Sequence, residues 1–378
     1  MRRHGRLRRR DADSMVDAHQ RIQAAVTAFA RGELVIVADD DDRENEGDLF
    51  VAASLCTPEK MAFIIRHTSG IVCAPLAQEQ ARRLHLDPMV ARNDAPLGTA
   101  FTVSVDVRHG LTTGISAEER TNTVRALANG NMGAADFVRP GHVFPLVAKE
   151  GGVLMRSGHT EACVDLCRLA GLPAVGVLAE LMNDDGTVMR GPQIAEFAAR
   201  HTLQRVTIAD LIAYRQARDK LIERVGEFPV ESEIGTLAGY AFQTPFDPFY
   251  HMAFVHGRIG EGMNVLTRLH RANLILDVFG GAKAIHRTLE RFKAEGRGVL
   301  VVLRDGAAGV PVISIPKSDE TASGEARTKQ WREVGLGAQI LRDLGVSSIR
   351  LLTFSRHMTY VGLSGFGIEI VGTEPVEV

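Results

Sequence analysis

The sequence predicts an α+β protein made of two mixed α/β domains. Apolar runs of strand length alternate with longer segments of helical periodicity along the whole chain, which favours sheets covered by helices. The composition, 45% hydrophobic and 24% charged, is that of an ordinary globular protein. The polar stretch GEFPVESEIG separates the two halves. We therefore expect one domain over residues 19–225 and a second over residues 232–378.

In the first half, short apolar runs predict strands and segments with capping signals predict helices. Pro58 stands in a first helical turn, Ser116 and Glu119 form a capping box, and Thr207 with Asp210 forms a capping pair. The expected strands are residues 34–38, 49–54, 71–76 and 101–107. The expected helices are residues 21–31, 58–70, 116–130, 159–171, 191–201 and 207–225.

The second half also alternates strands and helices, but the lengths of these elements differ from those in the first half. The expected strands are residues 237–243, 274–280, 298–306 and 348–354, and the expected helices are residues 281–295 and 331–344. The segment IPKSDETASGEARTKQ reads as a flexible loop.

Charge and cysteine usage exclude several classes of protein. The net charge is −2, so no nucleic acid or membrane surface is expected as a partner, and no apolar run is long enough to span a membrane. Six arginines in MRRHGRLRRR suggest a disordered basic extension over residues 1–18, a translation start that is really Met15, or a nucleic-acid arm. Four cysteines without a C-x-x-C pair indicate a reducing, cytoplasmic setting.

The segment DDDDRENEGDLF places seven carboxylates and one arginine in twelve positions. It is not a calcium loop, because Ala53 stands where a bidentate Glu is needed and the flanks look like strands. Glu44, Glu46 and Asp48 alternate, so an extended chain would project all three to one side. Carboxylates suit Mg²⁺ or Mn²⁺, and Arg43 could bind a phosphate. A merely solvated turn is the alternative.

Further candidates follow in the middle of the first half. Arg156, His159 and Thr160 open a helix, where backbone N–H groups and the helix dipole favour a phosphate; His159 is either a metal ligand or a cap. His142 lies in a loop bounded by Pro and Gly, and Glu180 lies in an apolar run, as a buried general acid/base or an outward-facing residue.

These segments together resemble 3,4-dihydroxy-2-butanone 4-phosphate synthase. The matching motifs over residues 20–220 are VADDDDRENEGDL, RHTSGIVCAPL, FTVSVD, TTGIS, RPGHVFPLVAKEGGVLMRSGHTEACVDLCRLAGL, GVLAELMNDDGTVMRG and TIADLIAYR. The resemblance implies a homodimer that converts ribulose 5-phosphate into the four-carbon phosphate plus formate in riboflavin biosynthesis, with active sites near the subunit interface.

The resemblance also implies residue roles. Mg²⁺ or Mn²⁺ would be held by Glu44 and His159, and catalysis would involve Arg43, Glu44, Asp48, His142 and Glu180. The substrate would be bound by Arg43, Glu44, Asp48, Glu180 and the segment Arg156, Ser157, Gly158, His159 and Thr160, with Cys73, Thr112 and Thr113 nearby. Thr112 and Thr113 could instead cap the helix that follows them.

Residues 232–378 resemble GTP cyclohydrolase II, through GYAFQTPFDPFYHMAFVHG, VLTRLHRANLILDVFG and GLGAQILRDLGVSSIRLLTF. That enzyme holds zinc with three cysteines. Here Asn273 replaces the first, and no cysteine follows Cys167. We therefore expect no zinc and an inactive domain, since His270, His286 and Asp277 offer only a remote substitute site. The alternatives are a bifunctional enzyme and a non-catalytic, metabolite-binding paralogue.

Overall fold

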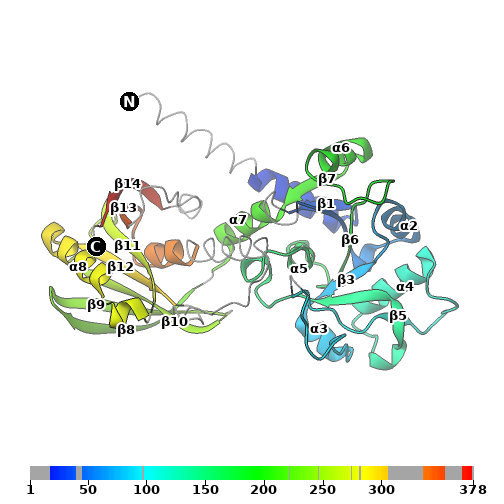
Figure 1. Ribbon diagram of the computed structural model, residues 1–378, viewed down its shortest axis with the longest axis horizontal. Coiled ribbons are helices and arrows are strands. Elements are labelled where there is room, and N and C mark those ends of the chain that lie inside the picture. The colour runs from blue at the N-terminus through cyan, green and yellow to red at the C-terminus, as the bar shows by residue number, and fades with distance from the viewer. Residues whose placement is uncertain are drawn as a thin grey trace. The chain divides into compact units, whose positions relative to one another are not determined.

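The computed structural model describes residues 18–39, 45–95, 98–220, 222–245, 247–273, 275–280, 282–304, 335–353 and 368–376. The described chain forms two compact units that divide between Tyr214 and Arg215. Figure 1 shows a strand-and-helix arrangement in each unit. The arginine-rich terminus up to residue 17, Arg43, Glu44 and the segment 315–330 lie outside the described residues. Within those residues, no helix is both long and apolar enough to cross a membrane.

The first unit is built on a seven-stranded mixed sheet with the order β4-β5-β3-β6-β2-β1-β7. Its strands are β1 (Val35–Ala38), β2 (Gly47–Ala52), β3 (Cys73–Leu76), β4 (Val105–Val107), β5 (Phe137–Val147), β6 (Gly176–Glu180) and β7 (Gln204–Thr207). β1 pairs in parallel with β7 and β3 with β5, whereas the other neighbours are antiparallel. The strand expected at residues 101–107 is shorter in the structure, where β4 begins at Val105.

Helices cover both faces of this sheet. They are residues 18–30, α2 (Pro58–His67), α3 (Gln78–Arg83), α4 (Ala117–Ala128), α5 (His159–Leu169), α6 (Pro192–His201) and α7 (Ile208–Arg218). The predicted capping signals are confirmed: the Ser116–Glu119 capping box is formed, and the Thr207 hydroxyl accepts from the Asp210 N–H at 3.0 Å.

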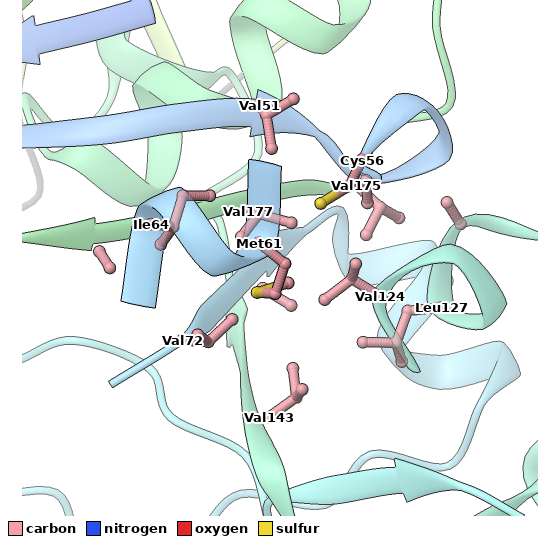
Figure 2. Close-up of a cluster of buried hydrophobic side chains, with 14 of the residues drawn as sticks. Val51, Cys56, Met61, Ile64, Val72, Val124, Leu127, Val143, Val175 and Val177 are labelled. Atoms are coloured by element: carbon pink, nitrogen blue, oxygen red, sulfur yellow. The ribbon is translucent and has the colours of Figure 1, made fainter. Parts of the chain in front are cut away.

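The alternation of side chains along β2 shows which helices lie on which face. Leu49 and Val51 belong to a core cluster with Met61 and Ile64 of α2, and Figure 2 shows Val51, Met61, Val124 and Val177 converging in it. Neighbouring residues of a strand point to opposite faces. The even-numbered residues of β2 therefore face α5, which contacts β2, β3 and β6.

The second unit holds another seven-stranded sheet, with the order β14-β13-β11-β12-β10-β9-β8. Its elements are β8 (Glu223–Ser232), β9 (Gly235–Thr244), β10 (Asp247–His256), β11 (Val265–Arg271), the π-helix η4 (Ile275–Phe279), α8 (Lys283–Glu295), β12 (Gly298–Leu303), a helix at residues 335–343, β13 (Ser348–Thr353) and β14 (Glu369–Pro375). Strands β12, β11, β13 and β14 run parallel.

Several segments of this unit differ from the prediction, and β10, β11 and β14 occupy residues for which no strand was expected. Residues 274–280 were expected as a strand, but η4 occupies residues 275–279, because a short apolar run does not distinguish a strand from a helical segment. The polar stretch at 226–235 mostly belongs to the edge strand β8, which pairs with β9. Its side chains alternate between exposed and half-buried, and this solvated edge reads as a linker in the sequence.

Candidate active site

One face of the first sheet carries a row of polar side chains. Directly paired residues of neighbouring strands point to the same face, and the register pairs Asp48 of β2 with Glu180 of β6. Phe50 pairs with Leu178, and its ring meets the His159 ring edge-on with the centroids 6.1 Å apart. Asp48, Glu180 and the start of α5 therefore share one face.

His159 and Asp48 form the buried centre of this face. His159 is the first residue of α5, and its Nε2 lies 4.0 Å from Asp48 Oδ1. The two residues are only 9% and 2% exposed. A carboxylate and an imidazole that face each other away from water supply the donor types of a divalent cation site, so the described part of the site fits such an ion.

Glu180 lies at the end of β6 and is half-buried rather than enclosed in the apolar run. The Ser69 hydroxyl donates to Glu180 Oε2 at 2.8 Å, and the Ser69 N–H donates to the Glu180 carbonyl at 2.9 Å. This pair of bonds orients the carboxylate towards the turn after α2. The sequence analysis missed Ser69, because a serine in a T-S-G turn carries no signal beyond the turn itself.

Cys73 lies on the same face, since β3 pairs Cys73 with Leu178 of β6. Burial raises the pKa of the Cys73 thiol, and the nearby carboxylates of Glu180 and Asp48 raise it further. Cys73 is therefore a neutral thiol that lines the site, since a nucleophilic cysteine needs a lowered pKa.

The acidic segment is described from residue 45 onward, and it places the carboxylate of Glu46 near those of Glu180 and Asp39. Burial raises the pKa of Glu46, with Arg190 opposing and Glu180 and Asp39 adding to the effect. Arg190 Nη2 lies 3.4 Å from Glu46 Oε1. Arg190, which the sequence analysis did not single out, therefore supplies a positive charge to this acidic region.

The turn before α5 holds the arginine predicted to bind phosphate. Arg156 Nη1 donates to Glu161 Oε2 at 2.7 Å, and Nη2 donates to the Thr99 hydroxyl at 3.3 Å. Glu161 is buried and also accepts from the Lys149 N–H at 3.0 Å. Gly158 is the N-cap of α5, and a Cβ there would lie 2.4 Å from Arg156 Nη1. The guanidinium is thus fixed beside the helix start.

The other predicted residues of this turn surround the N-terminus of α5. Gly158 has no side-chain cap bond to offer, Thr160 is buried in the first turn, and Ser157 precedes the cap. The structure therefore brings together Arg156, Ser157, Gly158, His159 and Thr160, with backbone N–H groups at a helix start, which is an arrangement that suits an anion.

His142 lies on β5, at the same end of β3 as Glu180. His142 precedes Phe144 by two residues, and Phe144 pairs with Cys73; Glu180 follows Leu178 by two residues, and Leu178 pairs with the same Cys73. Two strand spacings separate β5 from β6, about 10 Å. His142 Nδ1 lies 2.7 Å from Asp106 Oδ2, and Asp106 is a residue that the sequence analysis missed.

Thr112 and Thr113 bond to the start of the following helix, which is the second of the two alternatives that the sequence analysis gave for them. The Thr112 N–H and hydroxyl donate to Glu119 Oε1 at 2.7 and 2.8 Å, and the Thr113 hydroxyl lies 3.5 Å from Glu119 Oε2. The bonds from the Thr112 N–H and hydroxyl, with smaller contributions from Gly114 and Ser116, lower the pKa of Glu119 to about 2. In this structure both hydroxyls therefore support the start of α4.

Two of the predicted residues, Arg43 and Glu44, lie in the part of the chain that the structure does not describe. Among the described residues, no group of three or more His, Cys, Asp or Glu side chains is arranged to hold a metal ion. The proposed convergence of Glu44 with His159 therefore remains a prediction.

In the second unit, the three residues considered for a substitute zinc site are engaged in two different pairs. His270 Nε2 lies 3.0 Å from Asp277 Oδ2, whereas His286 Nδ1 lies 2.8 Å from Glu233 Oε2. Asp277 also accepts from the Asn273 N–H at 2.8 Å.

Comparison with known proteins identifies both halves. Residues 23–214 match the family model of 3,4-dihydroxy-2-butanone 4-phosphate synthase. The chain belongs to this synthase family. Residues 223–375 match the family model of GTP cyclohydrolase II, so the two domains are fused as the sequence predicted, and the synthase is a lyase of riboflavin biosynthesis.

Relatives that match both halves of the chain are named either bifunctional or monofunctional. The chain is 45% identical to the bifunctional riboflavin biosynthesis protein RIBA 1 of Arabidopsis thaliana, over 94% of this chain and 68% of that protein. It is 43% identical to the monofunctional riboflavin biosynthesis protein RIBA 2 of the same plant, over 97% of this chain and 79% of that protein. Both are described as chloroplastic.

Solved structures agree with this assignment. RibBX from A. baumannii, described as a two-domain synthase, is 34% identical with a TM-score of 0.77 and covers 93% of this chain and 99% of its own. A synthase crystallised with two magnesium ions is 46% identical with a TM-score of 0.52, and covers 52% of this chain and 97% of its own. The predicted fold class, family and lyase activity are therefore confirmed.

Proposed function

We propose that the first domain converts D-ribulose 5-phosphate into 3,4-dihydroxy-2-butanone 4-phosphate and formate on the face that carries Asp48, Glu180 and His159. The observation that supports this most directly is the buried approach of His159 Nε2 to Asp48 Oδ1, 4.0 Å apart, next to Glu180 in the strand register. The two products contain all the atoms of the substrate, so the reaction needs proton transfers and bond migration but no co-reactant.

The residues have distinct roles in this proposal. Glu44 and His159 would hold Mg²⁺ or Mn²⁺, and the acid Asp48 lies beside His159. A bound cation would supply positive charge against oxygens of the substrate that become negative when a neighbouring carbon loses its proton. The magnesium ions of the related synthase support this choice of metal.

The remaining groups bind substrate and move protons. Arg156 and the N–H groups at the start of α5 bind the phosphate, together with Ser157, Gly158 and Thr160, while Arg43 and Cys73 contact the substrate. Glu180, oriented by Ser69, and His142 donate and accept protons. Thr113 would lie near the substrate, although in this structure its hydroxyl lies 3.5 Å from Glu119 Oε2.

The test is formate release from ribulose 5-phosphate by the whole protein. EDTA should abolish release, and added Mg²⁺ or Mn²⁺ should restore it. Glu44→Ala and His159→Ala should each lower the rate by more than about 10²-fold. Glu196→Ala removes a carboxylate that is 72% exposed on α6 and should leave the rate unchanged. Near-normal turnover by either site variant would refute the metal assignment.

We further propose that the second domain lacks cyclohydrolase activity. The chain has no cysteine after Cys167, and a zinc site of the three-cysteine type cannot be built without them. The name of the monofunctional relative shows that a protein of this two-domain kind has been described with one activity. The alternative is a bifunctional enzyme. Formate release from GTP, or one zinc ion per chain in metal analysis, would favour that alternative.

The proposal includes a cytoplasmic homodimer. All four cysteines are free thiols, which agrees with a reducing compartment. Light scattering of the purified protein should give twice the 41.1 kDa chain mass, and the mass of one chain would contradict the dimer.

A further inference from the structure

The buried carboxylate of Asp106 holds His142 through two hydrogen bonds. Asp106 Oδ1 accepts from the His142 backbone N–H at 2.9 Å, and Oδ2 lies 2.7 Å from His142 Nδ1. The Asp106 side chain is 4% exposed, whereas the His142 side chain is 43% exposed. One side of the imidazole is therefore fixed to the protein while the ring itself reaches solvent.

This geometry selects one tautomer of His142. An ionised carboxylate only accepts hydrogen bonds, so the ring nitrogen that faces it must carry a proton. A neutral His142 then has its proton on Nδ1 and a bare Nε2, which is the nitrogen able to accept a proton from a substrate.

Gly114 closes the space around this pair. Its φ is +83°, and a Cβ built on it would lie 2.2 Å from Asp106 Oδ2 and 2.7 Å from His142 Nδ1. The T-T-G turn thus packs its backbone against the hydrogen bond itself, and its two threonines are held by Glu119. The contact leaves the carboxylate and the ring little freedom to separate.

We infer that Asp106 is a positioning residue of the reaction, which fixes His142 with Nδ1 protonated so that Nε2 serves as the proton acceptor. This inference rests on the proposed function, because it assigns a tautomer to a histidine proposed to transfer protons. The same division of labour between an acid and a histidine operates in serine proteases. Asp106 ends the matching segment FTVSVD, but the sequence analysis gave it no role because it stands there only as an acid in a strand-like run.

The decisive variant is Asp106→Asn. The His142 backbone N–H requires an acceptor, so the Asn oxygen should take the place of Oδ1 and its NH₂ group the place of Oδ2. That NH₂ group donates to Nδ1, which moves the ring proton to Nε2. We expect kcat to fall by about 10²- to 10⁴-fold, with KM changed much less, because His142 keeps its place but loses its acceptor.

The spectroscopic readout is the ¹⁵N spectrum of the histidine side chains, with the His142 signals assigned through their loss in His142→Gln. In the unmodified protein we expect protonated Nδ1 and bare Nε2, and in Asp106→Asn the reverse. Asp136→Asn is the matched control: its carboxylate lies 2.9 Å from His109 Nε2 in the same domain, and kcat should stay unchanged. Gly114→Ala should lower kcat by displacing the pair.

Three results would overturn the inference: bare Nδ1 in the unmodified protein, normal kcat in Asp106→Asn, or a loss of kcat in that variant without a change of tautomer. The first needs only the His142→Gln variant for signal assignment, so it remains decisive even if Asp106→Asn unfolds the protein. If the unmodified protein releases no formate from ribulose 5-phosphate, the proposed function fails instead, whatever tautomer His142 has.

Discussion

The contact between α5 and β6 should be sensitive to a single methyl group at Gly176. Gly176 begins β6, and a Cβ built on it would lie 2.2 Å from the Sγ of Cys163, which is fully buried on α5. Real atoms do not approach so closely, so Gly176→Ala must push the helix from the strand. Because α5 starts with His159 and β6 ends with Glu180, this separation would also disturb the proposed site.

The expected cost follows from overpacking a core. Inserting a methyl group into a well-packed interior destabilises a protein by about 1–3 kcal/mol. For a domain of this size, each kcal/mol lowers Tm by roughly 2–4 °C. Gly176→Ala should therefore lower the Tm of the first domain by roughly 2–12 °C. The synthase activity should fall as well, because His159 and Glu180 are carried by the two displaced elements.

The double variant Gly176→Ala/Cys163→Ala separates this clash from other causes. Removing the Cys163 sulfur opens the space that the new methyl group occupies, so the double variant should be more stable than the sum of the two single changes by about 1 kcal/mol or more. Gly130→Ala is the matched control, since a Cβ there would meet nothing within 4 Å. The assay is thermal unfolding of the whole protein, followed by circular dichroism.

Two outcomes would refute the packing argument. One is a Tm of Gly176→Ala equal to that of Gly130→Ala. The other is an additive double variant, which would show that Cys163 does not carry the clash. Either result would mean that α5 and β6 are less closely packed than the structure shows.

Two further predictions concern thiols and acid stability. Burial raises the pKa of Cys56 to about 11, and all four cysteines are buried, so a thiol reagent at pH 8 should label the native protein much more slowly than the urea-unfolded chain; rapid native labelling would contradict this. Hydrogen bonds from Thr112 lower the pKa of Glu119 to about 2, so its contribution to stability is complete above its ordinary pKa of 4.5 and is lost as the pH falls towards 2. The difference in urea midpoint between the unmodified protein and Glu119→Gln should therefore shrink from pH 7 to pH 3, and a constant difference would exclude the carboxylate as its source.

Local signals in the sequence predicted helix starts well. Capping residues act through one or two hydrogen bonds over three positions, so Ser116 with Glu119 and Thr207 with Asp210 are readable without any tertiary information. The strand prediction for residues 274–280 was wrong because that segment depends on contacts that are not local in the sequence. Its helical form depends on Asp277, which bonds to His270 and to the Asn273 N–H, and these partners become visible only in three dimensions.

The sequence predicted which residues form the candidate site, but it did not predict which other side chains they contact. Asp48, Glu180 and His159 were recognised from their motifs, and the strand register places the first two opposite each other. Ser69, Arg190 and Asp106 were not recognised, since each acts by touching another site residue far away in the sequence. Such supporting residues depend on which strands become neighbours, and that order is not encoded in any short motif.

The proposed loss of cyclohydrolase activity is compatible with an intact fold of the second domain. Asn273, which stands where the resemblance implies the first zinc cysteine, lies beyond the end of β11 and before η4, where Ile275 and Phe279 are exposed. The core is elsewhere, made of Leu266, Phe292 and Leu300 among others. Replacing a ligand at a strand end removes no apolar contact from that core, so the sheet can persist without the metal. Asp277, which follows Asn273 by four residues, pairs with His270. If the domain instead needed zinc to fold, chelators would lower its Tm; we expect them to leave it unchanged.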